Sequence, residues 1–268
     1  MKNKKNNELA VCGFAAVSSL AKTPEKITRF YFLPERSKNF AHLCKTLASL
    51  RVPYNQVASS EELEKLSGSV HHQGVVAMIR FPEILLPAKK EIDLWQQNKS
   101  VVLLLDKIGN TNNFGAIVRS AVFFGVTDII ISDTNSYSYI TTSSYRSAQG
   151  AMEYVKIWEI SSSSLFLKAL SGKLLRMGTD VRSGESLHGC TALAQNNDKG
   201  IVLVLGSEED GVSPEVKKAC DIIVTIAGAE CSENSMPEKP MKIESLNVAQ
   251  AASVLLYEIT CRKNSSRR

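Results

Sequence analysis

The chain has 268 residues, of which 44% are hydrophobic and 22% are charged, with 32 Lys plus Arg against 27 Asp plus Glu and a formal net charge of +5. This composition is typical of a globular protein with one large or two moderate domains, and it excludes collagen-like and disordered chains. No run approaches the ~20 apolar residues that a transmembrane helix requires, so we expect no membrane span and a cytoplasmic protein.

The first 80 residues alternate short apolar runs with helical patterns. Strands are expected at 9–12, 28–33, 54–57 and 74–79, and helices at 14–21, 38–50 and from Ser60 onward. Lys2, Lys4 and Lys5 precede an apolar segment, as in a secretory signal peptide, but Glu8 stands where the apolar region of such a signal should begin. The pattern therefore predicts a small α/β domain over residues 1–80.

Residues 81–99 are predicted to be a linker because they contain Pro82, Pro87 and a cluster of charged residues at 89–93. Beyond it, residues 100–268 repeat a strand-then-helix order. Strands are expected at 101–105, 128–131, 155–157, 173–177, 201–205 and 222–226, and a last helix at 246–260. Continuous apolar runs separated by helices predict a parallel sheet, with ligands bound at the carboxyl ends of its strands.

The positive charge is unevenly distributed, because residues 1–97 carry 14 Lys plus Arg and 9 Asp plus Glu whereas residues 98–268 carry 18 of each. The whole excess therefore lies in the N-terminal part. Such asymmetry fits a domain that binds nucleic acid, although an ordinary solvated basic surface would give the same counts.

The six cysteines lie far apart, at positions 12, 44, 190, 220, 231 and 261, with no Cys-x-x-Cys pair. No histidine stands at the distance from a cysteine pair that a zinc site needs. We expect free thiols in a reducing compartment and no metal.

Three polar segments follow expected strands. The first runs from Asn110 through Asn113 and Gly115 to Arg119, at the start of a helix. Arg119 lies more than one turn inside that helix, where it fits a functional residue or a surface residue with a buried stem equally well.

The second segment, Leu205-Gly206-Ser-Glu208-Glu-Asp-Gly211-Val212-Ser, nearly spells a phosphate-binding P-loop. Val212 occupies the lysine position, however, and three successive carboxylates would repel a triphosphate. An acidic solvated turn remains an alternative to a ligand-binding loop. The third segment, from Met241 to Asn247, precedes the last helix, and Ser245 is predicted to be its N-cap.

Together and in this order, Asn113-x-Gly115-x-x-x-Arg119, Leu-Gly206-x-Glu208-x-x-Gly211 and Ser245-Leu-Asn247-Val resemble the three motifs of the SpoU (TrmH) class of RNA ribose methyltransferases. The run Val70-His-His-Gln73-Gly resembles the end of the RNA-binding domain that some members carry. The resemblance covers roughly residues 8–80 and 100–262, and three ordered motifs are far more specific than one.

This resemblance implies a SPOUT fold, in which a knotted parallel-sheet methyltransferase domain follows a small α/β RNA-binding domain. It further implies a homodimer that uses S-adenosyl-L-methionine (AdoMet) to methylate a ribose 2′-hydroxyl of structured RNA, with rRNA favoured over tRNA. By the same resemblance the catalytic residues are Asn113, Arg119, Glu208, Ser245 and Asn247. The residues implied to bind the cofactor are Leu205, Gly206, Gly211, Ile226, Met241 and Leu246.

The sequence departs from the family pattern at Asn110-Thr111, where Asp-Pro is usual, at Glu209, where Gly is common, and in an insertion over residues 228–240. These departures motivate an alternative, a non-catalytic RNA-binding or assembly protein that keeps the fold. The intact Asn113, Arg119, Glu208 and Asn247 favour the enzyme. Arg119 could act as a base or as an orienting group, and the sequence leaves both open.

Overall fold

The computed structural model describes residues 2–3, 8–132, 138–195, 198–207, 210–228 and 245–265. The chain forms two compact units. Unit 1 comprises Met1–Ile84, Asn110–Val122 and Asn135–Lys156, and unit 2 comprises Leu85–Gly109, Phe123–Thr134 and Ile157–Arg268. Within the described residues, no helix combines the length and the apolar character that crossing a membrane requires.

Unit 1 contains a mixed sheet of five strands in the order β1-β2-β5-β3-β4, in which only β3 and β4 run parallel. Its strands are β1 (Lys2–Asn3), β2 (Glu8–Cys12), β3 (Ile27–Phe32), β4 (Tyr54–Gln56) and β5 (Val75–Arg80). Its helices are α1 (Phe14–Leu20), α2 (Ser37–Ser49), α3 (Ser60–Ser67), α5 (Thr111–Phe123) and α6 (Thr142–Ala148), with 3₁₀ turns η1 (Pro24–Lys26), η2 (Pro34–Arg36) and η4 (Ala151–Tyr154). Every strand and helix predicted before residue 80 is confirmed, with ends shifted by one or two residues.

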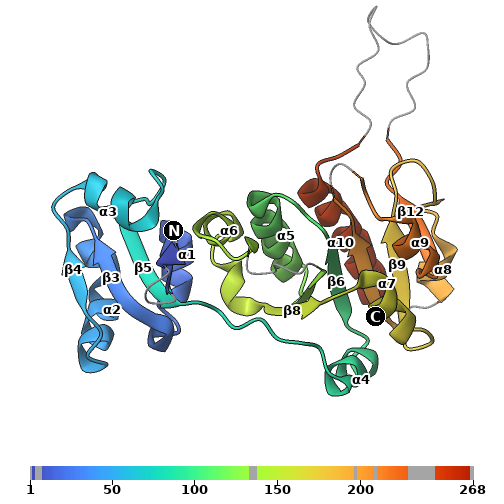
Figure 1. Cartoon of the computed structure of the whole chain (residues 1–268), viewed down its shortest axis with the longest axis horizontal. Helices are drawn as coiled ribbons and strands as arrows, with labels where there is room; N and C mark the ends of the chain where they lie inside the picture. The colour runs from blue at the N-terminus through green and yellow to red at the C-terminus, as the bar shows by residue number, and fades with distance from the viewer. Residues whose placement is uncertain are drawn as a thin grey trace, which may run out of the picture. The chain divides into compact units, whose positions relative to one another are not determined.

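Side chains from the sheet and from the helices beside it form the core of this domain. Ala10 and Cys12 on β2, together with Val76 and Met78 on β5, pack in one buried cluster with Leu63 of α3. The helices α2 and α3 lie beside the sheet (Figure 1). Alternation along each strand thus directs one set of side chains toward the helices, as period-two patterning requires.

Unit 2 contains a sheet of seven strands in the order β10-β12-β9-β11-β6-β7-β8, and each strand pair whose register is resolved runs parallel. The strands are β6 (Val101–Asp106), β7 (Asp128–Ser132), β8 (Lys156–Ile160), β9 (Leu174–Thr179), β10 (Glu185–Ser186), β11 (Gly200–Leu205) and β12 (Ile222–Thr225). The helices are α4 (Lys89–Gln97), α7 (Ser163–Ala169), α8 (Thr191–Gln195), α9 (Pro214–Lys218) and α10 (Val248–Ser265). The predicted parallel α/β sheet is confirmed, and only the two-residue β10 was not anticipated.

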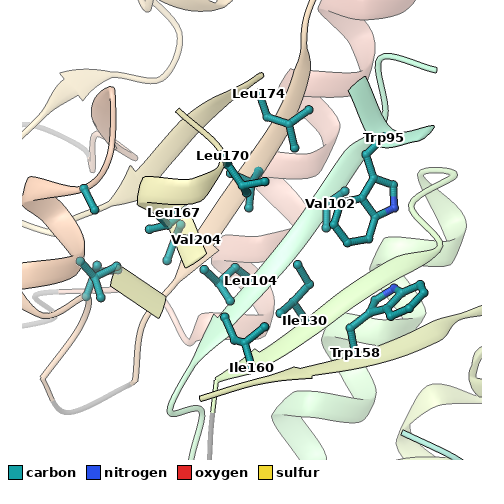
Figure 2. Close-up of a cluster of buried hydrophobic side chains, with 14 residues drawn as sticks. Trp95, Val102, Leu104, Ile130, Trp158, Ile160, Leu167, Leu170, Leu174 and Val204 are labelled. Carbon is teal, nitrogen blue, oxygen red and sulfur yellow. The ribbon is translucent and has the colours of Figure 1, made fainter. Parts of the chain in front are cut away.

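The central strand β6 is buried on both faces, as its continuous apolar run predicts. Val102 and Leu104 lie in a cluster with Val204 of β11, while Leu103 and Leu105 on the other face are also fully buried. Figure 2 shows the first face, where side chains of adjacent strands point to the same side. Burial on both faces explains why these strands lack an apolar–polar alternation.

Helix α4 lies within the segment that the sequence analysis treats as a linker. Its Trp95 is buried in the core of unit 2, and its ring packs edge-on against Trp158 with 5.8 Å between ring centroids (Figure 2). An edge-to-face aromatic pair adds about 0.5–1.5 kcal/mol to the burial of both rings. The helix is therefore a structural part of unit 2.

Candidate active site

The first polar segment opens α5. Asn110 accepts a hydrogen bond on Oδ1 from the backbone N–H of Asn112 at 2.8 Å, and its carbonyl accepts the N–H of Phe114 at 3.0 Å. These are the contacts of an N-cap residue. Asn110 therefore supplies the helix start that the missing Asp-Pro would otherwise provide.

Gly115 allows α5 and α6 to approach closely. A Cβ atom built at Gly115 would lie 2.3 Å from the backbone oxygen of Ser144 and 2.8 Å from Cβ of Ser147. At the same contact, Oδ1 of Asn112 accepts hydrogen bonds from the hydroxyls of Ser143 at 2.6 Å and Ser147 at 3.0 Å. A side chain at position 115 would separate the two helices, so the motif requires glycine for packing.

Asn113 and Arg119 both lie on α5, six residues apart and hence about 120° apart around the helix. Asn113 is half-buried and Arg119 is exposed. Among the residues that the structure describes, Arg119 has no hydrogen-bond or ion-pair partner, so its five N–H donors are available to a ligand.

The second segment forms a tight loop after β11. A Cβ atom at Gly206 would lie 2.1 Å from the carbonyl carbon of Gly211, and the N–H of Gly211 donates to the carbonyl of Ser207 at 3.0 Å. Gly211 has φ +66°, in the left-handed region that favours glycine. Both motif glycines are thus explained by the loop's backbone, and buried Leu205 ends the strand beneath it.

The ends of β9 and β12 lie at this same carboxyl edge. Thr179 at the end of β9 donates from its hydroxyl to the carbonyl of Val204 at 3.0 Å, and Thr225 at the end of β12 accepts the N–H of Leu187 at 2.9 Å. Half-buried Ile226 follows directly. The loops after three parallel strands therefore share one edge of the sheet, which is the usual ligand position in such folds.

Asp180 anchors the loop between β9 and β10. Burial raises the pKa of its carboxyl, but the Lys217 ammonium, the N–H of Arg182 and the Ser183 hydroxyl together hold that pKa well below its usual range. The carboxylate therefore stays charged at neutral pH and fixes the loop to α9, which carries Lys217.

The third segment differs from the prediction at its cap. Helix α10 begins at Val248, and Oδ1 of Asn247 accepts the N–H of Ala249 at 2.9 Å. Asn247 is therefore the N-cap, and the prediction that Ser245 caps the helix is wrong. Ser and Asn are both favoured N-cap residues, so the sequence pattern did not distinguish Ser245 from Asn247. The cap is the residue directly before the first helical one, which the backbone conformation decides. Ser245 and Leu246 are exposed just before it.

Two candidate residues, Glu208 and Met241, lie outside the described residues, as do Glu209 and most of the 228–240 insertion. The other candidates fall in three groups, one of which is Ser245, Leu246 and Asn247 directly before α10. Asn113 and Arg119 both lie on α5. Leu205, Gly206 and Gly211 lie together at the carboxyl edge of the unit 2 sheet, and Ile226, directly after β12, lies at the same edge.

His72, in the turn before β5, has a structural role. Its Nδ1 accepts the N–H of Gly74 at 3.0 Å, and its Nε2 lies 2.9 Å from the hydroxyl of Ser60. Both ring nitrogens are therefore occupied, one by the turn before β5 and the other by the first residue of α3. Across the described residues, no group of three or more His, Cys, Asp or Glu side chains could hold a metal ion.

Comparison with known proteins identifies relatives of both parts of the chain. Residues 100–257 match the family model described as the SpoU rRNA Methylase family, and residues 10–85 match the model for RNA 2'-O ribose methyltransferase substrate binding. The 23S rRNA (guanosine-2'-O-)-methyltransferase RlmB of Acinetobacter baylyi is 30% identical over 259 residues, which span 94% of this chain and 96% of that protein.

Solved structures have the same fold over nearly the whole chain. The SpoU methyltransferase AviRb from Streptomyces viridochromogenes, in complex with the cofactor AdoMet, has a TM-score of 0.69 at 21% identity and covers 98% of this chain and 92% of that chain. An AdoMet-bound rRNA methyltransferase from Sinorhizobium meliloti has a TM-score of 0.73 at 16% identity and covers 96% and 88%. At these identities, the likeness establishes the fold alone.

Proposed function

The chain belongs to the SpoU rRNA methylase family, and from this premise we propose that it transfers a methyl group from AdoMet to a ribose 2′-hydroxyl of RNA, with rRNA as the substrate. The observation that carries the proposal is the match of the methylase model to more than half of the chain, at the residues that form the β11 loop and α5. The substrate-binding match over residues 10–85 supports RNA as the partner.

AdoMet would bind at the carboxyl edge of the unit 2 sheet, against Leu205, Gly206, Gly211, Ile226 and Leu246, with Met241 as a further contact. A Cβ atom at Gly211 or Gly228 would meet no described atom within 4 Å. The loop from 205 to 213 has carboxylates and no lysine, which suits a sulfonium cation better than a phosphate. When bound, the cofactor supplies an activated methyl group whose sulfur leaves as a neutral thioether.

Arg119 would orient the 2′-hydroxyl and stabilise the negative charge that develops on its oxygen, while the hydroxyl proton is released to solvent water. Removing a proton from a guanidinium at neutral pH costs about 1.4 kcal/mol per pKa unit, or roughly 7 kcal/mol in all, which disfavours a free base. Its exposed N–H donors suit a phosphate and a hydroxyl held together. Asn113, Glu208, Ser245 and Asn247 are proposed to position Arg119 or the ribose.

Transfer from labelled AdoMet to transcribed 23S rRNA, 16S rRNA and tRNA tests the function, with digestion to nucleosides to locate the methyl group on ribose. We expect a 2′-O-methylated nucleoside from rRNA and none from tRNA. No transfer to any RNA, together with intact RNA binding, would support the non-catalytic alternative instead. Mapping 2′-O-methyl sites in cells with and without the protein would then identify the nucleotide.

We also propose a homodimer, supported by an exposed aromatic patch in unit 2 formed by Phe123, Phe124, Val254 and Tyr257. Phe123 is 82% exposed and Tyr257 57% exposed, yet the ring of Phe124 contacts both, with centroid distances of 5.1 and 6.3 Å. Clustered exposed rings of this kind mark interfaces more often than isolated apolar residues do.

Sedimentation velocity tests the dimer. Tyr257→Asp should shift the protein to monomer, whereas Leu165→Asp, which alters an equally exposed residue on α7 outside the patch, should leave the dimer intact. Equal sedimentation of Tyr257→Asp and the unchanged protein would contradict the proposed interface.

We propose further that the segment ending in α10 forms the trefoil knot of the family and that the protein works in the cytoplasm. The last turn of α10 supports the first point, because Lys263 donates to the carbonyls of Lys99 and Lys199, which directly precede β6 and β11. Free thiols such as Cys12 and Cys190 suit a reducing compartment.

A further inference from the structure

A continuous polar chain in unit 1 connects the N-terminal domain to the start of α5. Arg146 of α6 donates from Nη1 to the hydroxyl of Ser69 at 3.1 Å and from Nη2 to the hydroxyl of Ser143 at 3.5 Å. The Ser143 hydroxyl lies 2.6 Å from Oδ1 of Asn112. Because a guanidinium can only donate, the Ser143 hydroxyl accepts a hydrogen bond from Arg146 and donates one to Oδ1 of Asn112, so the hydrogen bonds all run in one direction.

Several further hydrogen bonds hold the loop around Ser69, where this hydrogen-bond path reaches the N-terminal domain. The hydroxyl of Ser69 also accepts the N–H of His71 at 3.2 Å, and the backbone N–H of Ser69 donates to the hydroxyl of Ser67 at 3.2 Å. Two residues further, Oε1 of Gln73 accepts the N–H of Phe14 at 2.7 Å. The loop after α3 is thus fixed at several points, and Arg146 binds to an anchored partner.

Other contacts hold the α6–η4 segment against the same domain. The hydroxyl of Thr142 donates to the carbonyl of Ala10 at 2.8 Å, and Lys26 pairs with Glu153 at 2.7 Å. Neither contact reaches α5. A side-chain path from the N-terminal domain to the first turn of α5 therefore runs through Arg146 and Ser143.

We infer that Arg146 is a positioning residue, which couples the RNA-binding domain to the helix that carries Arg119. The position of the Arg119 guanidinium relative to RNA held by the N-terminal domain would then be fixed, because Asn112 lies two turns before Arg119 on nearly the same face of α5. Proximity effects in catalysis are lost when reacting groups are displaced by about 1 Å, so a loose α5 would slow transfer without weakening binding. This inference rests on the proposed function for its catalytic consequence but not for the coupling itself.

Hydrogen exchange measured by mass spectrometry on the peptide covering 110–118 tests the coupling without any reaction. Arg146→Met should speed exchange in the first turn of α5 about tenfold, since hydrogen bonds to a charged donor are lost. Ser143→Ala should have a similar effect and Ser143→Thr, which keeps the hydroxyl, should not. Arg80→Met removes an equal charge from the exposed end of β5 and serves as the control. Unchanged exchange in Arg146→Met would overturn the inference.

Kinetics distinguish positioning from direct RNA contact. In single-turnover transfer at saturating rRNA, Arg146→Met should lower the rate about tenfold, while the Kd values for RNA and AdoMet stay within about twofold. Arg146→Lys should rescue only partly, because an ammonium cannot reach both hydroxyls in the same geometry. A weakened RNA Kd with a lower salt slope and an unchanged saturating rate would make Arg146 a phosphate contact and refute positioning. If the unaltered protein transfers no methyl group, the proposed function fails, and the exchange experiment still decides the coupling.

Discussion

Replacing Gly115 with alanine tests whether this motif glycine serves the packing of α5 on α6. The new Cβ would lie 2.3 Å from the carbonyl oxygen of Ser144, which belongs to helix backbone and cannot rotate away. The two helices must separate by about 1 Å to restore an ordinary contact. That movement would also stretch the hydrogen bonds that Asn112 accepts from Ser143 and Ser147.

The expected magnitude follows from two opposed effects. Overpacking a well-packed contact costs about 1–3 kcal/mol, and replacing glycine by alanine inside a helix returns about 1 kcal/mol. A 2.3 Å contact with helix backbone places the cost at the upper end of this range, about 2–3 kcal/mol. The net destabilisation should therefore be about 1–2 kcal/mol, which lowers the melting temperature by about 2–8 °C in a protein of this size.

Thermal unfolding of Gly115→Ala beside Gly109→Ala provides the measurement. Gly109 lies two residues before α5, its φ is not positive, and a Cβ atom there would meet no described atom within 4 Å. Its substitution should change stability by less than about 0.5 kcal/mol or stabilise slightly. If both variants melt at the same temperature, the close approach at Gly115 does not constrain the helices and the packing argument is wrong.

Three further predictions concern the candidate site. Gly206→Ala should abolish AdoMet binding in calorimetry, because its Cβ would lie 2.1 Å from the backbone of Gly211 and open the loop; binding at the original affinity would exclude this loop as the cofactor site. Arg119→Ala should eliminate transfer with little loss of AdoMet affinity, and Arg119→Lys should rescue poorly; near-full activity of the lysine variant with a rate rising toward alkaline pH would instead identify general-base chemistry. Asp180→Asn should lower the melting temperature at pH 7, because the carboxyl pKa is depressed in the folded state. Its contribution is present above the unfolded pKa of about 3.9 and is lost as the pH falls through the folded value, so the difference between variant and parent should shrink below about pH 4; a constant difference down to pH 2 would contradict the ion pair with Lys217.

Local patterns predicted the secondary structure well because they depend on neighbouring residues. The apolar run at 101–105 indicated a strand buried on both faces, and β6 is such a strand. The helix start at 111 and the loop after 205 were also placed correctly, since each follows a strand. The N-cap of α10 was predicted at Ser245, two residues before Asn247, which caps the helix that begins at Val248.

Several residues had no distinguishing signal in the sequence. Asn112, Ser143 and Arg146 resemble ordinary polar helix residues. Arg146 and Ser143 lie one turn apart on α6, and only the approach of α6 to α5 makes Ser143 a partner of Asn112. Trp95, in a segment with the composition of a linker, is buried because Trp158 packs against it. Such contacts join residues that are between 3 and 63 positions apart, so most of them lie beyond any local window.

The sequence by itself determined the kind of most elements, though not of α4, as well as the parallel sheet, because hydrophobic periodicity and turn residues act within a few positions along the chain. The tertiary structure alone decided the strand order in which β11 lies between β6 and β9, and the reasons for Gly115 and Gly206. The physical reason is that close approach and hydrogen-bond partnership depend on distances through space, which chain separation does not specify.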